Sequence, residues 1–171
     1  TFRTYSQPFL LLFLIPFSLT TVAWGHLVHG FPVNVISLLG VIALVGILVN
    51  DGLVLISKFN SNLRAGKSYD ESLFGAGKER FRAIFLTSIT TMAGLAPIIF
   101  EKSFQAQLLK PMAISIAYGI GYATFLTLIL LPILLSLTNT FKLNFIWLRS
   151  GKKLDKREVE APVIELKREK K

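Results

Sequence analysis

The chain has 171 residues, of which 52% are hydrophobic, with a net charge of +9 and no cysteine. The lack of cysteine excludes disulfides, thiolate metal sites and cysteine catalysis. The two histidines lack HExxH-type spacing, which argues against a histidine-ligated metal site. Lys and Arg lie mainly between long apolar segments or in the C-terminal tail, a distribution typical of membrane proteins rather than soluble domains. The chain starts at Thr1 without a leader-like segment, so we expect it to belong to a longer protein.

Four stretches are long enough to cross about 30 Å of hydrocarbon at about 1.5 Å per residue. They are residues 9–28, 33–56, 83–100 and 112–137. Buried helices of a soluble protein are the alternative, but four such stretches joined by charged connectors favour transmembrane helices. We therefore predict an all-α membrane protein with a transmembrane region over residues 9–138 and a cytoplasmic lead-in over residues 1–8.

The connectors predict the orientation of these spans. Segment 57–82 carries six Lys and Arg residues and segment 139–171 carries ten, whereas segment 29–32 has none and segment 101–111 has two. Because basic residues gather on the cytoplasmic side, both ends of the chain and the connector 57–82 are predicted to be cytoplasmic.

The two basic segments differ in their expected structure. In the connector 57–82, Ser68 and Glu71 have the spacing of a capping box. This spacing predicts a short amphipathic helix on the membrane surface, with a solvated connector as the alternative. The tail 139–171 is predicted to be largely disordered, because its part after Gly151 mixes both charges with few large apolar residues. Its lysines could contact anionic lipid or act only to keep the tail in the cytoplasm.

Asp51 is the acidic residue placed inside a long apolar span, within the stretch GILVNDGLVLI. An ionised carboxylate costs at least about 2.5 kcal/mol at the centre of a membrane helix. The four spans place no Lys, Arg or His deep enough to neutralise it, so Asp51 must be protonated, hydrated or paired with a helix outside this chain. A proton or cation pathway and a hydrogen bond between helices are the two interpretations.

Small and polar residues follow one face of several spans. In the third span they lie at positions i, i+3, i+4 and i+7: Thr87, Thr90, Thr91 and Gly94. Small residues allow helix backbones to approach closely. Helix packing is therefore predicted at Gly46, Gly94, Ala117 and Gly121. The threonine hydroxyls have an alternative role, because threonine in a helix often bonds to its own i−4 carbonyl.

The stretches GILVNDGLVLISKFN and GKERFRAIFLTSITTMAGLAPIIFEKSFQAQLLKPMAISIAYGIGYATFLTLILLP resemble resistance-nodulation-division (RND) efflux permeases of the acriflavine-resistance type. The resemblance runs from about Tyr5 to Leu137 and covers the last four transmembrane helices of such a permease. It implies a twelve-helix bundle that forms a homotrimer in the lipid bilayer of a bacterial inner membrane. It also implies large periplasmic domains, a periplasmic adaptor, an outer-membrane channel and substrate export driven by inward proton movement.

The resemblance assigns roles to several polar residues. Asp51, Asn50 and Thr87 match positions of the family's proton relay, and Arg82 matches an arginine at the cytoplasmic entrance of helix eleven. Thr90 and Thr91 are supporting residues. The chain departs from the well-studied drug pumps, because Asn50 stands in place of a lysine and Asp51 in place of an asparagine. An extra acid beside the acids of helix four implies that at least one carboxyl is protonated or that another cation enters.

Other function classes compete with the exporter. The first is a non-transporting membrane module, such as a lipid-sensing or protein-export scaffold, built on the same helical core. An intramembrane enzyme would need a second acid within the four spans. Nucleic-acid binding is disfavoured because the orientation rule already accounts for the basic charge. No cofactor or metal is expected, and the expected coupling ion is the proton.

Overall fold

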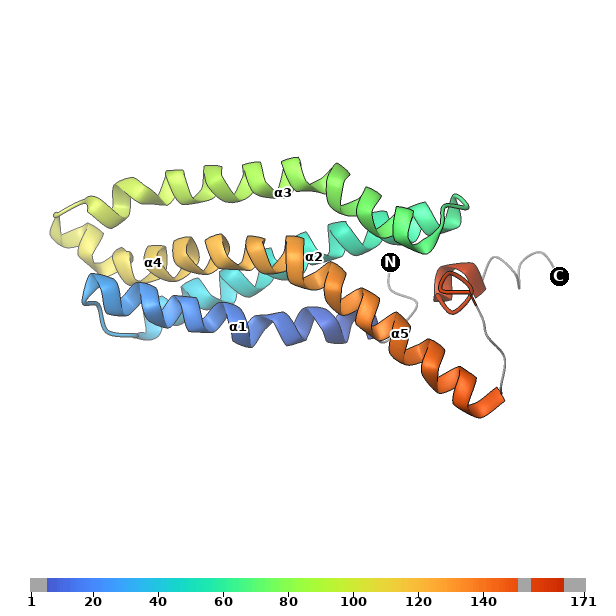
Figure 1. Cartoon of the computed structure of the whole chain (residues 1–171). Helices are drawn as coiled ribbons and strands as arrows, with labels where there is room; N and C mark the ends of the chain where they lie inside the picture. The colour runs from blue at the N-terminus through green and yellow to red at the C-terminus, as the bar shows by residue number, and fades with distance from the viewer. Residues whose placement is uncertain (1–5, 151–154, 165–171) are drawn as a thin grey trace.

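The computed structural model describes residues 6–150 and 155–164, and the regular structure in these ranges is helical throughout (Figure 1). The elements in chain order are α1 (Ser6–His29), α2 (Val35–Arg64), α3 (Tyr69–Phe100), α4 (Phe104–Phe125), the π-helical segment η1 (Leu126–Leu130) and α5 (Leu131–Ser150). The lead-in residues 1–5 and the tail residues 151–154 and 165–171 lie outside the described residues.

Four helical runs are long and apolar enough to cross a membrane. Three of them are α1, α2 and α3, and the fourth is formed by α4, η1 and α5 together. Each predicted span lies within one of these runs, except that α2 begins at Val35 rather than at residue 33. The predicted all-α membrane fold is therefore confirmed.

Helix α4 is the centre of the bundle, since it packs against α1, α2 and α3 (Figure 1). Its contact with α2 is the most extensive, and within it the fully buried Leu44 of α2 lies against Gly119 of α4. Outward-facing positions carry many large apolar residues, such as Leu12, Ile42 and Leu86, each more than half exposed. Lipid or further helices would have to cover such a surface.

Helical structure covers most of the connector predicted over residues 57–82. Helix α2 continues to Arg64 and α3 begins at Tyr69. Gly66 adopts a φ of 93°, and the N–H of Lys67 donates to the carbonyl of Asn62, which ends α2 in a Schellman turn. Only two residues later Ser68 starts α3, so the predicted surface helix is the first part of α3 and continues into the third span.

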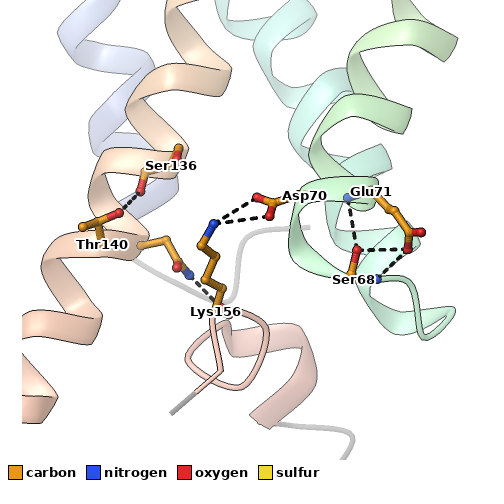
Figure 2. Close-up of polar contacts among 7 residues, drawn as sticks. Ser68, Asp70, Glu71, Ser136, Thr140 and Lys156 are labelled. Atoms are coloured by element: carbon orange, nitrogen blue, oxygen red, sulfur yellow. Dashed lines mark hydrogen bonds and ion pairs between the residues drawn. The ribbon is translucent and has the colours of Figure 1, made fainter. Parts of the chain in front are cut away.

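The predicted capping box at the start of α3 is present. The backbone N–H of Glu71 donates to the Ser68 hydroxyl, while the Glu71 carboxylate accepts from the Ser68 N–H at 3.1 Å and from its hydroxyl at 2.9 Å (Figure 2). These bonds hold the pKa of the Glu71 carboxyl below its ordinary value, the backbone bond having the larger effect. The box satisfies amide groups that a helix start otherwise leaves unpaired.

We expect Ser68→Ala to weaken the first turn of α3 by about 1 kcal/mol, the usual cost of losing a side-chain cap. Hydrogen exchange of the amides of residues 70–72 should then accelerate about fivefold. The start of α4, which Ser103 caps independently, serves as the internal control. Unchanged exchange over residues 70–72 would mean that the cap does not limit opening of this turn.

The fourth run changes direction where α4 meets α5 (Figure 1). Pro132 has no N–H to donate to the preceding turn. Just before it, the N–H of Leu131 reaches five residues back to the carbonyl of Leu126, which is the π-helical bond of η1. The widened turn lets α5 lean away from α4 while the helix stays continuous.

The prediction of a largely disordered tail is wrong for the described part of it. Residues 139–150 continue α5, and residues 155–164 fold back onto the bundle. Within the latter segment Val159, Glu160 and Val163 are buried. Composition alone missed this order because two valines and one proline suffice to cover a small apolar patch at the end of the bundle.

Candidate functional site

Asp51 lies midway along α2, next to the row of residues on this helix that faces the core. The row includes Leu48, Gly52 and Leu55, all buried, whereas Asp51 itself is half-buried and Asn50 is exposed. Within the described ranges 6–150 and 155–164, the Asp51 carboxylate makes no hydrogen bond or ion pair. The partner that an ionised carboxylate needs in a membrane is therefore not supplied by these helices.

The threonines of α3 direct their hydroxyls to their own helix. The Thr87 hydroxyl lies 3.0 Å from the carbonyl of Ala83 and 2.9 Å from that of Ile84. The hydroxyl of Thr91 donates to the carbonyl of Thr87 at 2.8 Å, and Thr90 donates to Leu86. No hydrogen bond joins Thr87 to Asp51 in the part of the chain that the structure describes. Each hydroxyl oxygen can still accept a hydrogen bond from a donor on another helix or from water.

The predicted polar stripes face away from the core of this bundle. Asn50 and Gly46 are exposed on α2, as are Thr87 and Gly94 on α3, and Arg82 is exposed near the start of the third span. An exposed polar stripe in a membrane helix must meet another helix or a hydrated cavity. The arrangement therefore leaves the predicted relay residues open to helices beyond the four described here.

Most of the glycines predicted to pack against another helix do not do so among the described helices. A Cβ atom on Gly46 or Gly94 would meet nothing within 4 Å. One on Gly121 would lie 3.2 Å from the Met92 sulfur, and Ala117 is buried on α4. The tightest approaches fall instead at Gly25, Gly40, Gly52 and Gly119. Periodicity indicates where small residues line one face of a helix but does not say which neighbouring helix that face meets.

Sequence reasoning also missed a buried hydroxyl contact between α3 and α4. The hydroxyls of Ser88 and Thr124 are hydrogen-bonded to each other, and each also bonds to a carbonyl of its own helix. Thr124 lies seven residues after Ala117, so it continues the small-residue face of the fourth span. That spacing was the available signal for it.

A second missed contact joins α1 to α2. The amide side chains of Gln7 and Asn60 exchange two hydrogen bonds, of 3.0 and 3.1 Å, and both residues are buried. Reciprocal amide bonds satisfy polar atoms that would otherwise be costly to bury. Among the described residues, no group of three His, Asp or Glu side chains could hold a metal ion.

The model of the AcrB/AcrD/AcrF family matches residues 1–139, most of the chain. The chain belongs to this family. It is 30% identical over 143 residues to the swarming motility protein SwrC of Bacillus subtilis, covering 83% of this chain and 14% of SwrC. It is 32% identical over 125 residues to the cobalt-zinc-cadmium resistance protein CzcA of Cupriavidus metallidurans, covering 73% of this chain and 12% of CzcA.

The multidrug resistance protein MdtC of Serratia proteamaculans is 26% identical over 155 residues, which cover 90% of this chain and 15% of MdtC. The chain thus spans about one seventh of the length of such relatives. No solved structure matches it significantly. The resemblance to the transmembrane part of RND permeases is confirmed by these matches.

Proposed function

We propose that the chain is part of a proton-coupled RND exporter, in which α2 and α3 are helices ten and eleven and carry residues of the proton relay. The observation that supports this most strongly is Asp51, a half-buried carboxylate in an apolar span with no partner among the described helices. Charges at such depth are usually functional. Family membership supports a transporter rather than an enzyme.

In this proposal Asp51 takes up and releases the transported proton. Its partners are acids on helix four of the same permease, which would lie against the outward faces of α2 and α3. The Asn50 amide and the Thr87 hydroxyl orient the proton between these acids, with Thr90 and Thr91 lining the same path. Arg82 lies near the cytoplasmic entrance. Without a lysine, neighbouring carboxylates cannot all ionise cheaply, so the group holds at least one proton in each state.

The substrate site belongs to parts of the permease outside these helices. The relatives include a cobalt-zinc-cadmium resistance protein and multidrug resistance proteins. Their names indicate different cargoes, yet this chain is similar to both kinds to a comparable degree. A shared membrane part that serves different cargoes is consistent with coupling rather than substrate recognition. We propose that the complete protein works as a homotrimer with a periplasmic adaptor and an outer-membrane channel.

The function is tested by substrate efflux from the complete permease carrying Asp51→Asn, with Asp51→Glu as the variant that keeps a carboxyl. Loss of efflux in the first variant at normal abundance would support the relay. Normal efflux would assign Asp51 to helix packing and would overturn its role in coupling.

The proposed orientation predicts which turns are accessible from outside. We expect a single cysteine replacing Lys102, between α3 and α4, to react with a membrane-impermeant maleimide in intact spheroplasts. A cysteine replacing Lys67, between α2 and α3, should react only after permeabilisation. Both lysines are exposed and each lies in a short turn, so the pair is matched. Labelling of position 67 in intact spheroplasts would reverse the proposed orientation.

A further inference from the structure

The described tail segment, residues 155–164, lies against the end of the bundle where α2 turns into α3 (Figure 1). It lies beyond the residues matched by the family model, which end at 139. We propose that this segment, here called the strap, is an intramolecular ligand of that end of the bundle. Its docking ties α5 to the α2–α3 turn.

One anchor of the strap is on α5. The Asn139 amide donates to the carbonyl of Lys156 and to the Glu160 carboxylate, both at 2.8 Å. Lys142, one turn further along α5, lies 3.7 Å from the other oxygen of the same carboxylate. Glu160 is only 4% exposed, and a carboxylate so buried needs such donors. The contact is thus a built site rather than a chance approach of a charged tail.

A second anchor joins the strap to the end of α2. The Arg157 guanidinium donates to the carbonyl of Leu63 at 3.2 Å, in the last turn of that helix. That carbonyl also accepts from the N–H of Gly66 at 3.2 Å, and the helix dipole favours a cation at this end of α2. Arg157 therefore acts as a side-chain cap for α2, supplied from a position 94 residues later in the chain.

The strap also makes an ionic contact with α3 and an apolar contact with the core. The Lys156 ammonium lies 3.3 Å from both oxygens of Asp70, in the first turn of α3 (Figure 2). Both side chains are about half exposed, so this pair contributes little. Val163, by contrast, is 5% exposed and belongs to the same apolar cluster as Phe59 and Tyr69. Apolar burial and the two anchors dominate the docking.

The ionic contact nevertheless provides a direct probe of docking in the native protein. A water-soluble carbodiimide activates the Asp70 carboxyl, the Lys156 amine forms an amide with it, and the carbodiimide leaves as its urea. The same reagent should join Lys58 to Glu79, an ion pair of 2.6 Å between α2 and α3 that does not involve the strap. Mass spectrometry of the digested complete permease gives the yield of each link, and their ratio reports docking.

We expect the Lys156–Asp70 link to form in the native permease with a yield similar to that of Lys58–Glu79. Asn139→Ala should lower the ratio of the two links at least about fivefold, because the buried Glu160 loses its amide donor and the Lys156 carbonyl loses its contact with α5. Val163→Asp, a change in the strap itself, should do the same. Thr138→Ala is the matched control on α5, since the Thr138 hydroxyl bonds to its own helix at Leu134.

Two results would overturn the proposal. The first is absence of the Lys156–Asp70 link, or a ratio that both Asn139→Ala and Val163→Asp leave unchanged, while Lys58–Glu79 forms normally. The second concerns which copy supplies the strap, and is tested by mixing ¹⁵N-labelled and unlabelled chains before assembly. A predominance of links between labelled and unlabelled peptides would mean that the strap binds a neighbouring copy. Neither readout depends on transport, so failure of the relay proposal would leave this one intact.

Discussion

Asp51→Asn is expected to lower substrate efflux by the complete permease about tenfold or more, because the asparagine keeps the shape and polarity of the side chain but cannot carry a proton through the membrane. The measurement is efflux driven by an imposed pH gradient in proteoliposomes of equal protein content. Substrate binding without a gradient should stay near its original level, since the substrate site is proposed to lie outside these helices. A joint loss of both would indicate a structural defect.

The matched variant is Asp51→Glu. It keeps a titratable carboxyl and should retain part of the efflux, although its longer side chain shifts the carboxyl relative to its partners. If Asp51→Asn and Asp51→Glu were equally active, the carboxyl would serve as a hydrogen-bonding group between helices. If only Asp51→Glu failed, steric fit rather than proton transfer would control this position. Membrane abundance of each variant provides the common reference.

Much of the fold was predictable because hydrophobic length and charged connectors are strong signals in membrane proteins. The ends of the helices were harder to predict. Residues 57–64 and 69–82 are largely polar yet helical, since they contain no proline and the cap at Ser68 starts α3 at once. Hydropathy marks where the bilayer lies, whereas helices extend beyond it. The strap was missed because its docking depends on partners 17 to 94 residues away.

The candidate site shows a different limit. Asp51 stood out from the sequence because a charge inside an apolar span is rare. The threonines and glycines were less informative than Asp51, since small residues are found both where helices pack together and where they line a polar path. The structure distinguishes the two roles. Gly40 and Gly119 each pack tightly against the facing helix, whereas Gly46, Gly94 and Thr87 face outwards. An outward position gains meaning only from what covers it, which we propose to be other helices of the permease.

The strongest steric effect is expected for Gly40→Ala, at the contact between α2 and α4. A Cβ atom there would lie 2.7 Å from the backbone carbonyl oxygen of Met112 and 2.8 Å from the Ser115 Cβ. A backbone atom within a helix cannot rotate away, so the two helices must separate along the most extensive contact of the bundle. Overpacking of this kind costs about 1–3 kcal/mol. We expect a clear fall in the thermal stability of the complete permease.

Gly77→Ala is the same chemical change without the obstacle, since a Cβ on Gly77 meets nothing within 4 Å. Gly77 lies within α3, where alanine favours the helix over glycine by about 1 kcal/mol. The two variants should therefore shift the unfolding temperature in opposite directions. Similar shifts for both would mean that helix propensity outweighs the α2–α4 contact. A loss confined to Gly40→Ala would identify this contact as the one that holds α2, and with it Asp51, in place.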